Sequence, residues 1–336
     1  MAIDTLNELA IGIDIGGTNT KYGVVNHRGI IVEKGVIRTD KHDDVDLFIN
    51  ELYTTLQPVM EKYQQAGSIK GIGVGAPNGN FFKGTIEHAP NLQWKGVIPF
   101  AKLMSQKFNL PCLLTKDASA AASGEMAYGA ARGMKNFIMI TLGTGVGSGV
   151  VVNGHVVYGQ NGYAGELGHT MIRHGGRLHK STKLKGTLEA YASATGIVAT
   201  AVELMSATND ESLMRQYKKA QLNSKVIYEC AQQGDKMAKK VFDFTGKILG
   251  EALANFVMFS SPEAIILFGG VIKAGNLLMV PTSRSMEKSL LPIFKGKVKL
   301  LFSELDEADA AILGASALVW EIKQPADEPI NTTYEA

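Results

Sequence analysis

The chain has 336 residues, of which 45% are hydrophobic and 20% charged, and its formal net charge is +2. This composition is that of a globular protein long enough for two lobes with separate cores, and the near-neutral charge argues against nucleic acid as a partner. The two cysteines, Cys112 and Cys230, lie far apart, which argues against a disulfide framework and fits a reducing compartment.

The two ends of the chain bear on location and order. The first ten residues carry Asp4 and Glu8 and lack the basic-then-apolar order of a signal peptide. No run of about 18 uninterrupted apolar residues occurs, so we expect a cytoplasmic protein without a membrane segment. Residues 324–336 are polar with two prolines, and we expect them to form a mobile tail.

Residues 11–37 predict three strands separated by the turns GGTNT and NHRG. Backbone N–H groups in such a glycine turn can cradle phosphate oxygens, and a threonine hydroxyl adds a donor. An acid at the strand end can hold Mg²⁺ directly or through water, and a nearby lysine neutralises phosphate charge. For one turn alone, a plain hairpin with scattered surface charge explains the pattern equally well. The residues concerned are Asp14, Gly16, Gly17, Thr18 and Lys21.

Strand and helix patterns alternate through the middle of the chain. Residues 45–66 have helical periodicity, and residues 69–77 predict a buried strand that ends in a Gly/Pro loop. A second strand is predicted over 110–117, followed by a helix of small residues over 118–131.

Residues 137–159 repeat the opening pattern. A shift of 127 positions places Ile11 on Ile138, Gly16 on Gly143 and Val24 on Val151. The chain therefore contains a hairpin-rich module twice, and two facing turns could grip one polyphosphate. The second turn offers Gly143, Thr144, Gly145 and Gly147.

The last third predicts a short buried strand, a Gly pair and a helix over 263–278, then a long helix over 306–323. Hairpins combined with strand–helix alternation predict α/β lobes with mixed sheets and a cleft between them. Two familiar phosphate motifs do not fit. No P-loop ending occurs, and Ser148 stands where the third glycine of a dinucleotide fingerprint belongs.

Seven motifs then follow one another along the chain: DIGGTNTK, GVGAPNG, NLQW, KDASAAA, TLGTGVGSG, GELGH and GTLEAYASATG. Their order resembles that of the ROK family of bacterial sugar kinases and sugar-sensing repressors, from about residue 9 to about residue 322. The resemblance implies a two-lobed actin-like ATPase (ribonuclease H-like) fold with a duplicated β-hairpin core and an interlobe cleft. It also implies a homodimer or tetramer. The lobes would comprise residues 1–125, completed by a helix at about 315–325, and residues 126–314.

The resemblance also implies roles for single residues. Both glycine turns would bind the phosphates of ATP, with Asp14 near Mg²⁺, and Gly269 and Gly270 would border the adenosine pocket. Asp117 would be the catalytic base. The residues implied to line the sugar site are Gly75, Asn78, Asn91, Lys116, Asp117, Glu166, His169 and Glu189.

Asp117 lies where a buried strand meets the alanine-rich helix, so helix N-cap is its plain structural role. The helix N-terminus is expected to favour its carboxylate form. The family usually has Asn-Asp where this chain has Lys116-Asp117. Lysine cannot accept a hydrogen bond and adds a charge that would also stabilise the carboxylate, which weakens the case for glucose as substrate.

Glu166, His169 and Glu189 each have a plain alternative. Alone, the two glutamates would read as solvated surface acids and the histidine as a structural one. Their places in matching motifs, and the three-residue spacing of Glu166 and His169, support a shared sugar site.

In most of the family, a structural zinc is bound by the histidine of GELGH and three cysteines in a C-x-C…C arrangement. This chain has no cysteine between His169 and Glu189, and the loop is one residue longer. Around the expected positions stand His179, Lys180, Ser181, Thr182 and Thr187. Hydroxyls and ammonium groups are poor zinc ligands, so we expect no structural zinc, although His169, His174 and His179 offer an alternative metal set. The basic residues expected to lie in water are Arg173, Arg177, Lys180, Lys183 and Lys185.

Together these patterns predict an ATP- and Mg²⁺-dependent kinase that phosphorylates a hexose or N-acetylhexosamine, glucose at O6 by default. Mannose, fructose, allose, N-acetylglucosamine and N-acetylmannosamine remain open. Three rivals are a catalytically weak or inactive sugar-binding protein, a filament protein of the same fold and a family repressor. A filament protein would lack GELGH, and a repressor would carry a DNA-binding domain before the first turn, which starts about a dozen residues in.

Overall fold

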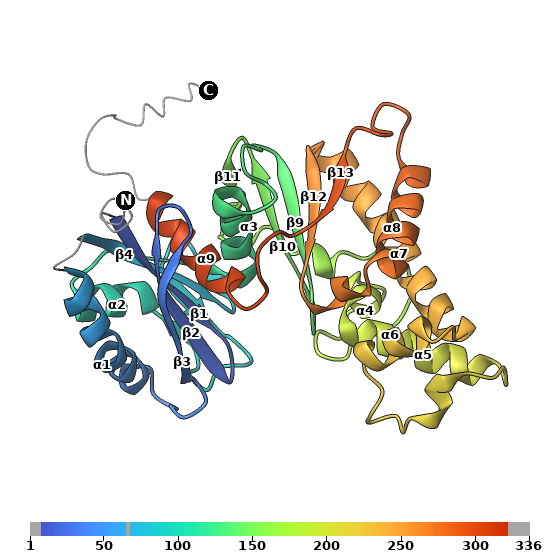
Figure 1. Cartoon of the computed structure of the whole chain (residues 1–336), viewed down its shortest axis with the longest axis horizontal. Coiled ribbons are helices and arrows are strands. Elements are labelled where there is room, and N and C mark those ends of the chain that lie inside the picture. Colours follow the sequence, from blue (N-terminus) through green and yellow to red (C-terminus); the bar gives the residue numbers. More distant parts are fainter. Residues whose placement is uncertain (1–7, 65–67, 322–336) are drawn as a thin grey trace.

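The computed structural model describes residues 8–64 and 68–321. Two lobes lie side by side, each built on a five-stranded mixed sheet (Figure 1). This arrangement confirms the predicted two-lobed α/β fold with a duplicated hairpin core. The predicted tail over 324–336 and the end of the predicted helix at 315–325 lie outside the described residues.

The first sheet has the strand order β3-β2-β1-β4-β8. The three opening strands form the predicted antiparallel meander, and β4 and β8 run parallel to β1. Helices α1 and α2 cover this sheet with a core that includes Phe48, Phe100 and Ile13. The elements are β1 (Glu8–Ile15), β2 (Asn19–Asn26), β3 (Ile31–Arg38), α1 (Val45–Gln64), β4 (Ser68–Ala76), α2 (Phe100–Phe108) and β8 (Cys112–Lys116). A small three-stranded sheet lies beside them, formed by β5 (Gly79–Asn80), β6 (Thr85–Glu87) and β7 (Val97–Ile98).

The second sheet has the order β11-β10-β9-β12-β13, and helices α4 to α8 lie on the side of this sheet that faces away from the first lobe (Figure 1). Its strands are β9 (Phe137–Leu142), β10 (Val146–Val152), β11 (His155–Val156), β12 (Ala264–Phe268) and β13 (Lys299–Phe302). Its helices are α4 (Glu189–Ala192), α5 (Ala194–Ala207), α6 (Ser224–Gln232), α7 (Lys236–Ser260) and α8 (Asn276–Ser289). Short 3₁₀ turns are η1 (Leu167–His169), η2 (Leu213–Gln216) and η3 (Gly270–Ala274). Across residues 8–64 and 68–321, no helix has the length and apolarity that a membrane span requires.

The two hairpins repeat with one difference in register. Ile11 pairs with Val24 in the first hairpin, whereas its counterpart Ile138 pairs with Val150. The turn between β9 and β10 is therefore one residue shorter than the turn between β1 and β2. The ungapped shift of 127 fits β1 and the start of the turn, but the paired strand β10 follows a shift of 126.

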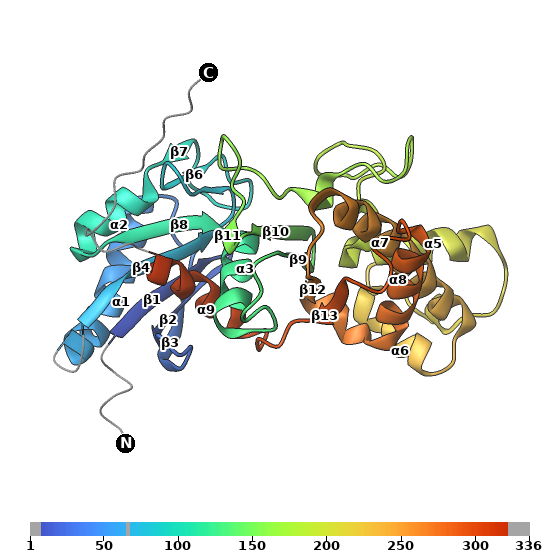
Figure 2. The same cartoon turned by 90° about the horizontal axis from the view of Figure 1, so that it is seen from above.

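Two helices lie between the sheets: α3 (Asp117–Tyr128) and α9 (Ala310–Ala317), as Figures 1 and 2 show from two sides. The predicted long helix over 306–323 is wrong in its extent. It ends as an α-helix at Ala317 and continues as the 3₁₀ turn η4 (Leu318–Glu321). The Leu318 N–H turns back to Ala315 and Ser316, which tightens the last turn.

Glycines let these helices approach both sheets and each other. A Cβ on Gly12 of β1 or Gly73 of β4 would collide with α9 backbone oxygens. A Cβ on Gly149 of β10 would lie 2.6 Å from the Ala122 Cβ of α3. Where the helices cross, a Cβ on Gly124 would lie 2.8 Å from the Gly314 Cα. The lobes therefore meet through small residues packed backbone to backbone.

We predict that Gly124→Ala lowers the free energy of unfolding by about 1–3 kcal/mol, because the added methyl meets a backbone that cannot retreat. Helix propensity alone predicts the opposite sign, a gain of about 1 kcal/mol. Urea unfolding decides between them. Ser206→Ala, at an exposed position of α5, serves as the control and should change stability by less than about 0.5 kcal/mol. A more stable Gly124→Ala protein would contradict the close crossing.

Candidate active site

Two carboxylates meet at the carboxyl ends of β1 and β8. Both strands run parallel to β4, so Asp14 at the end of β1 and Asp117 just after β8 reach the same edge of the sheet. Gly75 of β4 lies between them. A Cβ there would be 3.7 Å from Asp14 Oδ1 and 3.7 Å from the Asp117 Cα. The structure thus brings together three residues that stand far apart in the sequence.

Both acids have raised pKa values. Burial raises the pKa of Asp14 from 3.8 to about 6, the Asp117 carboxylate adds to the rise, and the Lys21 ammonium opposes it. Lys21 lies opposite Asp14 in the β1–β2 pairing. Burial also raises the pKa of Asp117, and the charge of Glu166 raises it further, whereas the Ala118 N–H and Lys116 lower it. The Ala118 N–H of the helix terminus and Lys116 act in the expected direction, but loss of water outweighs them, so the net shift of the Asp117 pKa is upward.

Asp117 is also not the helix N-cap. Lys116 occupies the capping position of α3, and Asp117 is its first helical residue. The Asp117 carboxylate accepts one bond from the adjacent Ala118 N–H at 2.7 Å. Asp117 as a whole residue nevertheless remains exposed, so protein atoms displace water around the carboxyl while a bound molecule can still reach the residue.

The first glycine turn closes on itself and touches a predicted sugar residue. The Gly16 N–H donates to the Asn19 carbonyl at 3.0 Å, which closes the turn. A Cβ on Gly17 would lie 2.7 Å from the Asn91 carbonyl oxygen, so only glycine permits this approach. Thr18 is exposed at the tip of the turn. The turn, Asn91 and the acid pair thus form one wall.

The second glycine turn is held by a glutamate. The Val146 N–H donates to Glu189 Oε2 at 2.7 Å, and a Cβ on Gly145 would lie 2.5 Å from the same oxygen. Gly147 lies against α3, where its Cβ would be 3.0 Å from the Ala118 Cβ. The second turn is thereby placed next to the first residues of the helix that begins with Asp117.

A cavity of about 400 Å³ opens beside the second turn. The predicted residues Gly143, Thr144 and Gly270 line it. Gly269 is not among its lining residues; a Cβ on Gly269 would lie 2.7 Å from the Leu142 carbonyl oxygen. Sequence reasoning missed further lining residues, because they lie in α6, α7, η3 and the loop before α9, outside the recognised motifs. These are Ser224, Lys225, Tyr228, Phe242, Lys273 and Glu307.

Lys116 bridges the two lobes. Its ammonium donates to Glu166 Oε1 at 2.6 Å and to the Ala164 carbonyl at 2.7 Å, and its side chain is only 9% exposed. The other oxygen of Glu166 lies 3.9 Å from His169 Nε2. Asn78, by contrast, uses its amide N–H groups on the backbone carbonyls of Glu87 and His88. Lys116, Glu166 and His169 are therefore grouped, and the Asn78 amide points its donors at its own hairpin.

A second set of contacts supports this bridge. The Phe81 ring of the first lobe stacks on Tyr158 of the second, with ring centroids 4.1 Å apart. The Tyr163 hydroxyl donates to Glu87, and the Asn80 amide donates to the Asn161 carbonyl at 3.0 Å. Residues 157–166 thus cross from one lobe to the other and carry Glu166 to Lys116.

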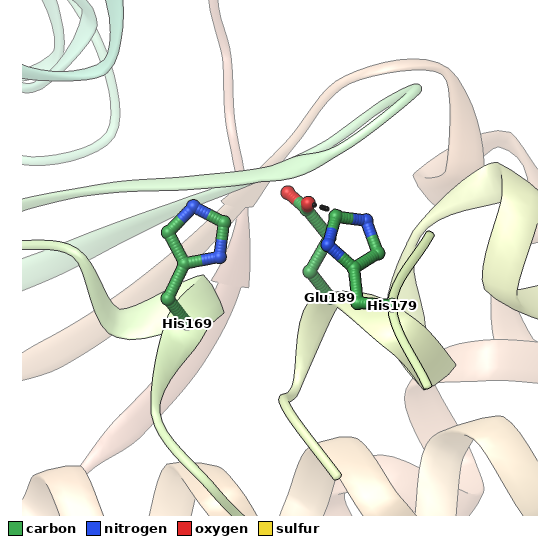
Figure 3. Close-up of side chains that lie close together, drawn as sticks. All are labelled: His169, His179 and Glu189. Carbon is green, nitrogen blue, oxygen red and sulfur yellow. Dashed lines mark ion pairs between the residues drawn. The ribbon is translucent and has the colours of Figure 1, made fainter. Parts of the chain in front are cut away.

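Glu189, the first residue of α4, lies near two histidines: His169 at the end of η1 and His179 in the loop that precedes α4. His179 Nε2 lies 2.9 Å from Glu189 Oε1, and His169 lies beside them (Figure 3). One nitrogen from each ring and one Glu189 oxygen lie within 4.8 Å of one another, so this trio replaces the His174-containing set as the candidate metal group. His174 is exposed and does not belong to it.

One of the loop's basic side chains is not in water as expected, because the Arg177 side chain is only 12% exposed. Arg173 pairs with Glu251 of α7, and its side chain is 37% exposed. Lys180, Lys183 and Lys185 are exposed, as predicted. No motif marked Arg177, because a basic residue in a polar loop ordinarily indicates a solvated surface.

Two lobes built on duplicated hairpin sheets, with glycine turns and paired carboxylates between them, define a two-lobed hexokinase-type fold. The ROK family model matches residues 10–322, and the chain belongs to the ROK family.

Individual relatives agree with this assignment. The chain is 37% identical to a glucokinase of Halalkalibacterium halodurans over 94% of each sequence. A ROK family glucokinase from Streptomyces griseus, in complex with glucose and AMPPNP, shares 29% identity with a TM-score of 0.74, over 93% of this chain and 99% of that one. A xylose repressor of Caldicellulosiruptor bescii is 26% identical over 92% of this chain and 77% of the repressor. The family therefore includes both kinases and repressors.

The raised pKa of Asp14 predicts a pH-dependent cost to stability. Because its folded pKa lies above its unfolded value, its contribution is most favourable below about pH 4 and is lost as pH rises through about 6. In protein free of metal and nucleotide, Asp14→Asn should raise the free energy of unfolding by up to about 2 kcal/mol more at pH 8 than at pH 4.5. Urea unfolding at both pH values measures this. Asp243→Asn, at an exposed position of α7, is the control, and equal gains at both pH values would contradict the assignment.

Proposed function

We propose that the chain is an ATP- and Mg²⁺-dependent hexose kinase that transfers the γ-phosphoryl group to a sugar hydroxyl, with O6 of glucose as the first candidate. The observation that carries the proposal is the meeting of Asp14, Gly75 and Asp117 at one sheet edge. A glycine turn lies on either side of this edge. The family assignment and the glucokinase relatives support the same function.

Asp117 is proposed as the base that accepts the proton of the attacking hydroxyl. Asp117 is an exposed residue that a sugar can reach, and a raised pKa makes it a better proton acceptor near neutral pH. In phosphoryl transfer such an acid mainly orients and deprotonates the nucleophile, because bond making in the transition state is loose. Positioning by the surrounding residues would supply the rest of the rate enhancement.

The residues present fit a divalent cation and a nucleotide. Asp14 and Asp117 are two neighbouring carboxylates; burial, and then the charge of Asp117, raise the pKa of Asp14, and oxygen ligands of this kind suit Mg²⁺. When bound, Mg²⁺ would neutralise phosphate charge as the phosphoryl group moves. The backbone N–H groups of the two turns and Lys21 would hold phosphate oxygens. The cavity bordered by Gly143, Gly270 and Tyr228 has room for the adenosine.

On the sugar side, we propose that Asn91, Glu166, His169 and Glu189 hold hydroxyls. Lys116 stands where related kinases carry asparagine, and its ammonium already engages Glu166. This pair would leave Glu166 one oxygen for the sugar and would present a cationic donor in place of an amide. The hexose preference is therefore expected to differ from that of a kinase with asparagine.

A coupled ADP-release assay with Mg²⁺-ATP against a panel of hexoses and N-acetylhexosamines tests the proposal. Turnover with at least one sugar supports it. Sugar binding by calorimetry without turnover would overturn it in favour of a sugar-responsive binding protein, the role that the family's repressors suggest.

Asp117→Asn should nearly abolish phosphorylation and leave sugar affinity within a few-fold, because the amide keeps the shape but cannot accept the proton. Steady-state kinetics and calorimetry measure the two effects. Asp243→Asn again serves as the matched control. A kcat above about a tenth of the wild-type value would mean that the activation free energy rises by less than about 1.4 kcal/mol, and it would contradict the assignment of Asp117 as the base.

Lys116→Asn should change the ranking of sugars more than it changes the KM for ATP, because the ammonium touches Glu166 and no residue of the nucleotide cavity. Measuring kcat/KM across the panel for both proteins tests this. Lys180→Asn, an exposed lysine of the loop, controls for the loss of charge. An unchanged ranking would show that position 116 does not set the substrate preference.

A further inference from the structure

The loop over 170–188 lacks the ligands of a closed zinc site. Three cysteines would accompany His169 in such a site, and around the expected positions stand His179, Lys180, Ser181, Thr182 and Thr187. Ser181 is exposed, and Thr187 is buried with its hydroxyl 3.4 Å from the Ala190 N–H. Hydroxyls do not replace thiolates on structural zinc, so the residues present do not fit a four-ligand site. Something else must hold this loop against the lobe.

Besides the pair of Arg173 with Glu251, Arg177 makes that connection. Its guanidinium forms five hydrogen bonds, which uses every N–H that an arginine side chain offers. Nε and one terminal nitrogen grip the Glu203 carboxylate at 2.8 and 2.6 Å. The remaining N–H groups donate to the carbonyls of Ala190 and Gly196 and to the Thr200 hydroxyl, at 2.7, 3.0 and 3.0 Å.

The same residue is fixed from two further directions. Its guanidinium carbon lies 4.5 Å from the centre of the Tyr191 ring, a cation–π contact. Its backbone N–H donates to the Tyr191 hydroxyl at 2.8 Å, and its carbonyl accepts from the Gly186 N–H at 2.8 Å. Arg177 thus joins both arms of the loop to α4 and α5, as a multivalent cation would.

What the anchored loop carries is His179, two residues further on. Its Nδ1 is held by the Thr182 hydroxyl at 2.8 Å, and its Nε2 faces Glu189 Oε1 at 2.9 Å (Figure 3). The other oxygen of Glu189 holds the Val146 N–H of the second turn. Glu189 is therefore fixed on one side by the turn and on the other by a histidine that lies two residues after Arg177.

We propose that Arg177 takes the structural place of a metal ion in this loop and acts, through His179, as a positioning residue for Glu189. The inference rests on the proposed sugar site in so far as Glu189 binds the substrate. Neither Arg177 nor His179 contacts the acid pair of Asp14 and Asp117. Their effect is on the orientation of the Glu189 carboxylate.

The test compares Arg177→Gln and Arg177→Lys with the wild type, and Lys180→Gln is the matched control for loss of charge in the same loop. Hydrogen–deuterium exchange over 170–188 should rise strongly in both Arg177 variants and stay unchanged in the control. The sugar KM should rise about tenfold or more, with the KM for ATP changed less than about threefold. Lysine restores the charge but not the five-donor fork, so full rescue by Arg177→Lys would overturn the proposal.

Glu203→Gln guards against a variant that fails to fold. Glu203 is 60% exposed in α5, and its amide would keep a neutral acceptor while three other guanidinium bonds remain. A smaller rise in loop exchange, in the same direction, is expected. No rise in either Glu203→Gln or the Arg177 variants would overturn the role of Arg177.

Metal analysis supplies the opposing outcome. Protein purified without chelator should contain well under a tenth of an equivalent of zinc, and EDTA should leave loop exchange unchanged. Near-stoichiometric zinc that disappears in His179→Ala, with loop exchange rising on chelation, would show that His169, His179 and Glu189 hold a metal and would overturn the proposal. Exchange and metal content need no turnover, so these arms decide even if no sugar is phosphorylated.

Discussion

The arrangement of this protein depends on one steric constraint, the absence of side chains where α3 and α9 meet the two sheets and each other. Gly12 and Gly73 admit the backbone of α9 to the first sheet, and Gly149 admits α3 to the second. The crossing at Gly124 and Gly314 then joins the helices. Because α3 begins with Asp117, this packing sets the depth at which that carboxylate stands between the two glycine turns.

The polar bridges between the lobes follow from that placement. Lys116 ends β8 one residue before α3, so the same packing directs its ammonium across to Glu166. Residues 157–166 are held to the first lobe by aromatic stacking and by the Tyr163–Glu87 contact. Contacts between the lobes therefore bring Lys116 to Glu166 and His169, which lie only three residues apart in the second lobe.

Much of the fold could be predicted from the sequence, namely those elements whose formation depends on short-range sequence patterns. The meander of β1 to β3, the repeat of the hairpin, the strand before Asp117 and the small-residue helix after it all carry local signals. What failed depended on tertiary packing. The shorter second turn moves the register by one residue, and the helix after Asp309 tightens at Leu318. Burial raises the pKa of Asp117, although the sequence predicted a lower value. A sequence pattern does not predict how strongly the folded protein desolvates a carboxyl group.

Arg177 illustrates the limit most clearly, because its role depends on five acceptors spread over α4 and α5. It also has a chemical consequence. A thiolate-bound metal site is open to oxidants, which convert the sulfur ligands to disulfide or sulfenic acid and release the ion. A guanidinium and its oxygen acceptors have no sulfur to oxidise. The loop before α4 would therefore keep its conformation in the presence of peroxide. The two cysteines of the chain, Cys112 and Cys230, lie outside this loop.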